Sequence, residues 1–233
     1  MARTKILIAT IKSWNINNAL KFKDMVGDQY DINVVSDKKD LNSSTLKKLN
    51  PLYIFFPHWS WIIPEEVYSV YECIVFHMTD LPYGRGGSPL QNLILNKMYK
   101  TKISAIKVEK DLDSGLVYPK RNLIIENGSA EKIYKKASDV IFFKMIPFIL
   151  KYKPMPKTQQ GKIVTFKRRN PSDSDLLKAK INNLRDICDF IRMLDAEGYP
   201  KAFINKNGLK ISFSNIHRLN NKLYGKYEIT YEK

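Results

Sequence analysis

The stretch FHMTDLPYGRGGSPLQNLI, residues 76–94, joins an apolar segment to an amphipathic one through a loop rich in glycine and proline. The apolar segment CIVFH (73–77) is typical of a buried strand. SPLQNLILNKM (88–98) has helical spacing and begins with Ser88 and Pro89, a combination common at helix starts. The stretch therefore predicts a strand, a loop and a helix in succession, the repeating unit of a parallel sheet.

The same alternation of predicted strands and helices precedes this stretch. Apolar runs predict strands at 5–10 (KILIAT), 30–36 (YDINVVS) and 52–56 (LYIFF). Helical patterns follow them at 18–28 and 42–50, and Pro64, Glu65 and Glu66 suit the first turn of another helix. We therefore expect an α/β protein, with a Rossmann-like, mostly parallel sheet and helices on both faces.

Beyond residue 100, strands are predicted at 102–110, 116–125 and 162–166, and one long helix at 127–152 with Ser129 as its cap. We predict a core domain over residues 1–167. The region 168–233 is predicted to form one or two helices and a β-hairpin around Asn207-Gly208. Such a small appendage cannot cover its apolar faces alone, so we expect a homodimer with this segment at the interface. The alternative is that the hairpin packs on its own core.

The charge balance of the 233 residues is strongly basic, with 39 Lys and Arg against 23 Asp and Glu and a net charge of +16. This balance favours an anionic partner, although scattered lysines on a solvated surface explain it equally well. Two cysteines predict neither a disulfide framework nor a metal site. The apolar run near the amino terminus is too short for a signal peptide, and VIFFKMIPFIL (140–150) is broken by Lys144 and Pro147. We therefore expect a soluble cytoplasmic protein without a membrane span.

The glycine-rich loop follows the strand that His77 ends, at the edge where parallel sheets bind ligands. Its glycines allow close approach of the backbone to a ligand. Neither of the common phosphate-binding glycine patterns, GxGxxG and GxxxxGK, is present. A structural turn without a ligand is the simpler alternative.

HMTDLPYGRGGSP resembles the motif of the folate-dependent formyltransferases, which reads Asn-x-His-x-Ser-Leu-Leu-Pro, then Arg-Gly and a helix-opening Pro. The residues that match in order are His77, Leu81, Pro82, Arg85, Gly86 and Pro89. VEKDLDSGLVY (108–118) resembles the Asp-x-Gly loop of the family through Asp113 and Gly115, and YIFFPHWSWIIP (53–64) occupies the place of its strand and turn. The resemblance covers about residues 4–150.

The resemblance implies transfer of a formyl group from 10-formyltetrahydrofolate to an amine, without a metal. His77 would take a proton from the amine or donate to the oxyanion of the tetrahedral intermediate, and Asp113 would orient His77 and help move protons. The alternatives are a hydrogen-bonded histidine at a strand end and a turn aspartate. Residues implied to hold the folate are Pro57, Trp59, Ser60, Leu81, Pro82, Arg85, Gly86, Gly87, Asp111 and Leu112.

One departure from the family pattern affects the chemistry. The family's catalytic Asn lies two positions before the His, where this chain has Val75, which cannot stabilise an oxyanion. His58, in the turn after the neighbouring strand, is our candidate for its replacement. A role in the folate pocket or on the surface is an equal alternative for His58.

Three subclasses of the family are compatible with the resemblance. The initiator-tRNA enzymes carry a longer carboxy-terminal domain than this chain, the purine-pathway enzymes usually retain the Asn, and the third subclass is the sugar N-formyltransferases. The short carboxy-terminal region resembles that of the sugar N-formyltransferases, so we predict an amino sugar carried by a nucleoside diphosphate, for surface glycan synthesis. Residues predicted to bind that substrate are Lys12, Ser13, Trp14, Asn15, Asp80, Arg168 and Arg169. The competing interpretations are a helix cap at Ser13 or Asn15, which is compatible with substrate contact, and a solvated linker that contains the arginines. The alternatives are a tRNA-directed formyltransferase and a catalytically inactive binding protein with this fold.

Overall fold

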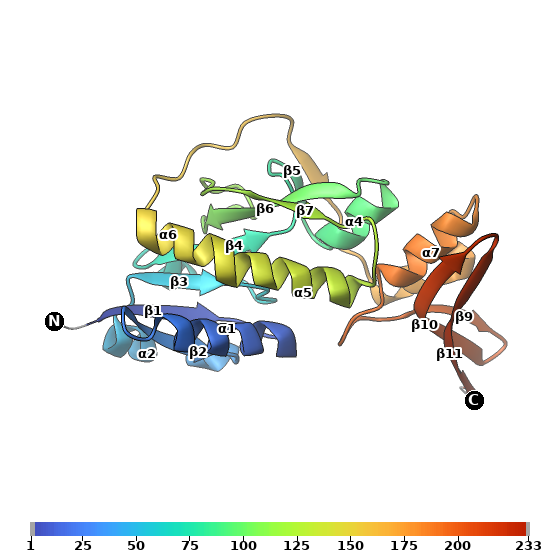
Figure 1. Ribbon diagram of the computed structural model, residues 1–233, viewed down its shortest axis with the longest axis horizontal. Coiled ribbons are helices and arrows are strands. Elements are labelled where there is room, and N and C mark those ends of the chain that lie inside the picture. The colour runs from blue at the N-terminus through green and yellow to red at the C-terminus, as the bar shows by residue number, and fades with distance from the viewer. Residues whose placement is uncertain (1–2, 232–233) are drawn as a thin grey trace. The chain divides into compact units, whose positions relative to one another are not determined.

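The computed structural model describes residues 3–231 (Figure 1). These residues form two compact units. The first unit consists of the chain up to Arg85, Lys102–Leu123 and Lys135–Thr165. The second consists of Gly86–Thr101, Ile124–Tyr134 and the chain from Phe166 onward. Each unit is therefore assembled from segments that are distant in the sequence.

The first unit is built on a six-stranded sheet in the order β2-β1-β3-β4-β6-β7. The pairs β1–β2, β1–β3 and β3–β4 are parallel, whereas β6 runs antiparallel to β4. The strands span Thr4–Ala9 (β1), Tyr30–Val35 (β2), Tyr53–Phe56 (β3), Glu72–His77 (β4), Lys100–Lys107 (β6) and Arg121–Ile124 (β7). The predicted Rossmann-like, mostly parallel sheet is confirmed.

Alternation of side chains along these strands gives the sheet two apolar faces. Leu7 and Phe56 pack in one cluster with Leu46 and Val67, from the helices α2 (Ser43–Leu49) and α3 (Glu65–Tyr68). Helix α1 (Ser13–Val26) packs instead against a long helical run. The ring of Phe22, from α1, lies 6.5 Å from the ring of Phe142, from that run.

That long run comprises α5 (Ala130–Val140), a π-helical stretch η2 (Ile141–Met145) and α6 (Ile146–Tyr152). It matches the helix predicted for 127–152. The Ser129 hydroxyl accepts the backbone N–H of Lys132 at 3.4 Å, in agreement with its predicted role as cap. The π-helical stretch lies just before Pro147, which has no N–H to donate to the preceding turn.

The loop after β4 forms a second, two-stranded sheet in which β5 (Tyr83–Gly86) pairs with β8 (Val164–Phe166). The strand predicted at 162–166 is present as β8, but it does not belong to the main sheet. Strand β8 is three residues long and lies beside β5, where the backbone N–H of Val164 donates to the Pro82 carbonyl at 3.3 Å.

The second unit contains α4 (Pro89–Leu95), the 3-10 turns η3 (Pro171–Ser174) and η4 (Leu176–Lys178), and α7 (Leu184–Arg192). Its antiparallel sheet consists of β9 (Ala202–Lys206), β10 (Leu209–Leu219) and β11 (Lys222–Tyr231). Asn207 and Gly208, with φ of 52° and 78°, make the predicted two-residue turn. The terminal run of the chain adds β11 as a third strand along β10.

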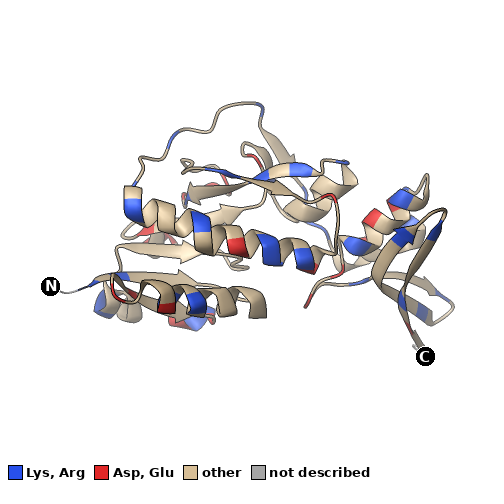
Figure 2. Ribbon diagram, in the orientation of Figure 1, with Lys and Arg blue, Asp and Glu red and all other residues tan. Residues whose placement is uncertain are grey.

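Lys and Arg are spread over helices and strands of both units (Figure 2). Within residues 3–231, none of the helices is long and apolar enough to cross a bilayer. Both cysteines are free thiols. The described residues include no cluster of His, Cys, Asp or Glu that could hold a metal ion.

Candidate active site

His77 ends strand β4, in the middle of the main sheet, and its side chain is only 10% exposed. Its Nε2 lies 2.7 Å from the carbonyl oxygen of Gly84. A carbonyl oxygen can only accept a hydrogen bond, so Nε2 carries the hydrogen of this contact. The other ring nitrogen, Nδ1, is therefore the one that can take up a proton.

The loop after His77 is held in place around this contact. The Ser104 hydroxyl donates to the Thr79 carbonyl at 2.7 Å and accepts the backbone N–H of Leu81 at 3.3 Å. The chain then turns so that the Gly84 carbonyl faces His77, and Gly84 takes a φ of 77°, which glycine adopts without strain. The glycine-rich loop thus fixes the orientation of the imidazole ring.

Asp113 reaches the same ring from the loop between β6 and β7. Its Oδ2 lies 3.5 Å from Nδ1 of His77, and its side chain is also 10% exposed. Gly115 is required in this loop, because a Cβ there would lie 1.9 Å from the carbonyl oxygen of Lys107. The Asp-x-Gly spacing therefore has a steric cause, and the structure brings the two predicted catalytic residues together.

Gln159 supports this arrangement and was missed by the sequence analysis. Its amide nitrogen donates to the carbonyl oxygens of Asp113 and Gly115, at 2.8 and 2.9 Å. Its amide oxygen accepts two hydrogen bonds from Arg85, at 3.1 and 2.8 Å. Gln159 thereby connects the aspartate loop to the loop that carries Arg85. It stands in a polar segment without regular structure, where no local pattern marks it.

His58 follows β3, which is the parallel neighbour of β4, with φ of 57°. Its ring meets Trp14 edge to face, with centroids 6.1 Å apart. Burial and, secondarily, the charge of Lys12 lower the pKa of His58 to about 4. His58 is therefore neutral at pH 7, where its ring provides one donor and one acceptor.

Val75, in the position of the family's Asn, packs beside Leu81, Ile106 and Val117. It points to the same face of β4 as His77, two residues later. The apolar neighbours of Val75 explain why a hydrophobic residue is accommodated at this position. Any donor to an oxyanion at this site must come from another residue.

Asp80, predicted to bind substrate, is engaged by two lysines. Its carboxylate lies 2.5 Å from Nζ of Lys120 and 2.9 Å from Nζ of Lys102. Burial raises the pKa of Asp80, but the hydrogen bonds from the two lysines outweigh this effect and leave the pKa below its ordinary value. Asp80 thus stays ionised and ties the loop to the neighbouring strands.

The residues predicted to bind substrate at the start of α1 are partly buried. Trp14 and Asn15 are 5% and 2% exposed, and the Asn15 amide donates to the Ile11 carbonyl at 3.4 Å. The cap position is Lys12, with a φ of 74° and no side-chain capping bond, so neither Ser13 nor Asn15 caps the helix. The capping alternative is therefore wrong. A direct contact with substrate stays a prediction for Lys12, Ser13, Trp14 and Asn15.

The residues predicted to hold folate lie in three loops of different exposure. Leu81, Pro82 and Pro57 are buried, Trp59, Arg85, Gly86 and Gly87 are half-buried, and Ser60, Asp111 and Leu112 are exposed. Trp59 contacts the rings of Phe56 and Trp61, at 5.9 and 4.8 Å between centroids. Its buried indole N–H has no hydrogen-bond partner among the described residues. An unpaired donor beside aromatic rings fits a flat heterocycle with acceptor atoms, such as a pterin.

Arg168 and Arg169 belong to the second unit. Arg168 is exposed. Its backbone passes close to Gly87, because a Cβ added to Gly87 would lie 2.4 Å from the Cβ of Arg168. Arg169 donates to the Asp173 carbonyl and lies over the Phe190 ring, 5.7 Å from its centroid. Burial lowers the pKa of Arg169. The structure thus gives Arg169 a packing role, which differs from the predicted diphosphate contact.

Comparisons with known proteins agree with this architecture. A family described as the C-terminal domain of methionyl-tRNA formyltransferase matches residues 171–230. The structure of a methionyl-tRNA formyltransferase from Clostridium thermocellum is 47% identical, with a TM-score of 0.95, and covers 98% of this chain and 100% of that chain.

Two further matches are more distant. A methionyl-tRNA formyltransferase from Campylobacter jejuni is 26% identical over 166 residues, 71% of this chain and 53% of the relative, so this chain spans about half the length of the curated relatives it matches. A sugar N-formyltransferase from Shewanella is 17% identical, with a TM-score of 0.68, and covers 95% of this chain and 99% of that one. Its likeness shows a shared fold alone.

The prediction of a nucleotide-linked amino sugar as acceptor is wrong. The 47% match and the curated relatives are named for methionyl-tRNA, which favours the alternative we considered second. The error arose from the carboxy-terminal region, which we judged too short to act on RNA. The match to a methionyl-tRNA formyltransferase C-terminal domain lies within that region.

Proposed function

Because the chain belongs to the formyltransferase family that includes the Clostridium thermocellum methionyl-tRNA formyltransferase, we propose that it formylates the amino group of methionyl-tRNA. The formyl donor is 10-formyltetrahydrofolate. The observation that carries the proposal is the 47% identity across 98% of the chain. The pairing of His77 with Asp113, at 3.5 Å, supports it independently.

The His77–Asp113 pair can accept the proton that the amine must lose. With Nε2 bonded to the Gly84 carbonyl, the Nδ1 lone pair and the Asp113 carboxylate are two acceptors that face each other. An amine nitrogen beside the pair can donate one N–H to each of these two atoms. Nδ1 would take up the proton that the amine loses as it bonds to the formyl carbon, and tetrahydrofolate would leave as the bond from its nitrogen to that carbon breaks, with a proton on that nitrogen. The Asp113 carboxylate would stabilise the imidazolium.

The formyl donor supplies an activated one-carbon group at the oxidation level of formate. Trp59 would hold its pterin ring through the unpaired indole N–H and the neighbouring aromatic rings. Arg85, Gly86 and Gly87, from the loop after β4, remain predicted contacts, as do the exposed Asp111 and Leu112. The neutral imidazole of His58 remains our candidate for the donor that the family's Asn provides elsewhere.

The net charge of +16 has the sign that a tRNA partner requires. The C-terminal domain match, residues 171–230, covers α7 and most of the three-stranded sheet. We propose that residues 1–167 catalyse the transfer and that the region 168–233 acts in recognition of the macromolecule. Like the folate-dependent reaction itself, this division is a proposal to be tested.

The test compares methionyl-tRNA, uncharged tRNA and free methionine as acceptors with 10-formyltetrahydrofolate. The proposal predicts formylmethionine, detected by mass after deacylation, from methionyl-tRNA alone. Failure to form it under conditions in which a characterised methionyl-tRNA formyltransferase is active would refute the proposal.

The presence of Val75 favours one alternative to an active formyltransferase, namely a protein that keeps the fold and binds its partner without catalysis. Its side chain offers no hydrogen-bond donor at the position of the family's Asn. The same assay decides between them, because an inactive protein binds methionyl-tRNA in a shift assay but yields no formylated product.

We also propose that two copies associate through the carboxy-terminal sheet. On one face of β10 and β11, Leu209 stands opposite Tyr231 and Ile211 opposite Ile229. Tyr231, Ile229 and Leu209 are 67%, 55% and 41% exposed. Burying these side chains against a twofold-related copy removes apolar area from water.

A further inference from the structure

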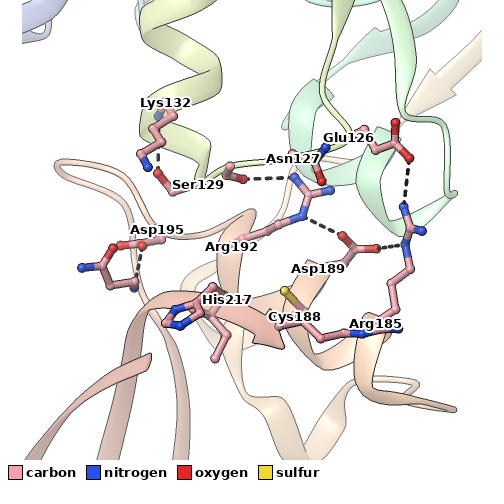
Figure 3. A pocket seen from close by; sticks show the side chains of 14 residues that line it. Glu126, Asn127, Ser129, Lys132, Arg185, Cys188, Asp189, Arg192, Asp195 and His217 are labelled. Carbon is pink, nitrogen blue, oxygen red and sulfur yellow. Dashed lines mark hydrogen bonds and ion pairs between the residues drawn. The ribbon is translucent and has the colours of Figure 1, made fainter. Parts of the chain in front are cut away.

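A cavity of about 450 Å³ in the second unit gathers an excess of basic side chains (Figure 3). Its walls come from the segment before α5 and from α5, α7 and β10. Five lining residues are basic, namely Lys132, Arg185, Arg192, His217 and Arg218. Glu126, Asp189 and Asp195 are its acidic residues.

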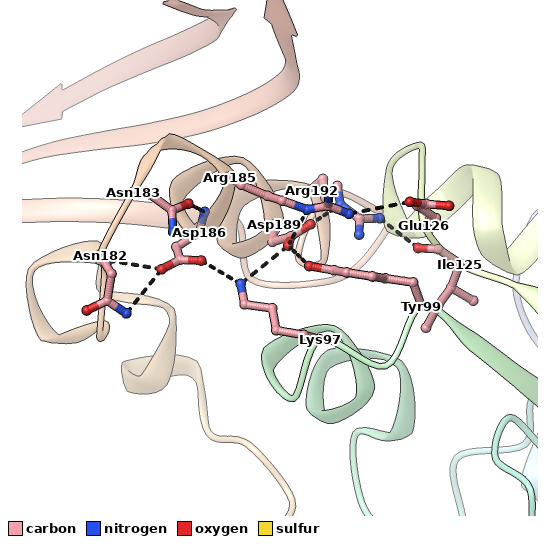
Figure 4. Close-up of polar contacts among 10 residues, drawn as sticks. All are labelled: Lys97, Tyr99, Ile125, Glu126, Asn182, Asn183, Arg185, Asp186, Asp189 and Arg192. Atoms are coloured by element: carbon pink, nitrogen blue, oxygen red, sulfur yellow. Dashed lines mark hydrogen bonds and ion pairs between the residues drawn. The ribbon is translucent and has the colours of Figure 1, made fainter. Parts of the chain in front are cut away.

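The most buried of these carboxylates is already committed to structural contacts (Figure 4). Asp189 accepts hydrogen bonds from Nε of Arg192 at 2.7 Å and from the Tyr99 hydroxyl at 2.6 Å. Its Oδ2 is also 3.5 Å from Nζ of Lys97. This carboxylate has little remaining capacity to balance the other basic groups around the cavity.

The other two carboxylates also have partners. Asp195 accepts the backbone N–H of Asn215 at 2.8 Å. Glu126 lies 3.6 Å from Nη2 of Arg185. Each of the three carboxylates that line the cavity therefore already has a partner.

Within residues 3–231, no carboxylate lies at ion-pair distance from Lys132, His217 or Arg218. The His217 ring is held by stacking on Tyr224, with centroids 5.6 Å apart and an interplanar angle of 20°. Lys132 and Arg218 carry positive charges without a carboxylate partner, and an anion bound in the same cavity would be attracted to both.

Arg192 provides a second, independent observation. The residue is 5% exposed, and its Nη1 donates to the carbonyl oxygens of Ile125 and Gly128, at 3.0 and 3.1 Å. With Nε on Asp189, the guanidinium is fixed in one orientation. Its Nη2 is buried and lacks a hydrogen-bond partner among the described residues. Such a fixed guanidinium with a donor to spare suits the oxygens of an anion.

We propose that this cavity binds a phosphate group, carried either by RNA or by a small molecule. Phosphate offers several acceptor oxygens to basic groups that converge from different directions. The cavity uses none of the residues of the candidate active site. Binding of an RNA phosphate rests on the proposed recognition of tRNA by the region 168–233, whereas binding of a small phosphorylated molecule does not.

The test measures binding of inorganic pyrophosphate and of a short RNA hairpin by calorimetry, at constant ionic strength set with sodium chloride. The variant Lys132→Gln/Arg218→Gln removes two exposed charges from the cavity. The control Lys222→Gln/Lys226→Gln removes two exposed charges from the same unit, outside the cavity. Circular dichroism and the unfolding temperature establish that both variants are folded.

We expect pyrophosphate, RNA or both to bind the cavity variant about tenfold more weakly than the control, the effect of losing charge-assisted contacts. A loss confined to pyrophosphate identifies a small phosphorylated ligand. A loss of RNA affinity, with a weaker salt dependence, identifies a backbone phosphate. Equal affinities of the two variants for both probes, or no binding of either probe to the wild type, would overturn the proposal.

Discussion

Replacing Asp113 with Asn should slow formyl transfer by about 100-fold or more. The substitution keeps the shape of the side chain and removes the charge that lies 3.5 Å from Nδ1 of His77. At an effective dielectric constant of about 20, unit charges at that distance attract by about 4.7 kcal/mol. Complete loss of this stabilisation corresponds to about 3,000-fold in rate, and the remaining amide dipole recovers part of it.

The assay is single-turnover formation of formylmethionine at saturating folate and methionyl-tRNA, which isolates the chemical step. Glu109→Gln is the matched control, because this carboxylate is exposed in the same loop four residues earlier and has no proposed role in the site. We expect the control to stay within about twofold of the wild type, as for most exposed substitutions. A folded Asp113→Asn variant with wild-type turnover would refute the reasoning.

Further predictions concern the surroundings of the site and the carboxy-terminal sheet. Gln159→Leu should lower kcat by about tenfold, because it removes the hydrogen bonds that hold the aspartate loop and Arg85. The control Gln160→Leu should leave kcat unchanged. Equal kcat values for the two variants would show that Gln159 does not support the site. The pKa of His58 is lowered to about 4, below its unfolded value of about 6.5, so its contribution to stability is present above pH 6.5 and is lost as the pH falls toward 4. Urea unfolding of His58→Gln should therefore depend less on pH across this window than that of the wild type. Light scattering should give about twice the 27.1 kDa monomer mass for the wild type and the monomer mass for Ile229→Ser; a wild-type monomer would exclude the dimer.

Much of the fold could be predicted from local patterns. The uninterrupted apolar runs within β1, β3 and β4 predict buried strands. The turn at Asn207-Gly208 follows from the φ angles that these two residues tolerate. The proximity of His77 and Asp113 was inferred from a resemblance, since no local rule relates two loops 36 residues apart.

Features that depend on distant pairing were not predictable in this way. Strand β8 is short, and its pairing with β5 instead of the main sheet depends on tertiary contacts that a local pattern does not contain. Gln159 acts through amide contacts that any polar loop residue could in principle make. The alternating pattern of the carboxy-terminal strands indicates a sheet but contains no information about the acceptor that the protein formylates.

The central claim is that His77 accepts a proton while this chain formylates methionyl-tRNA. The most direct measurement is quenched-flow formation of formylmethionine by the wild type and by His77→Asn, each with bound folate and tRNA confirmed beforehand. The account predicts a product burst with the wild type and a rate at least about 100-fold lower with His77→Asn. Equal rates for the two proteins, or no product from the fully loaded wild type, would contradict it.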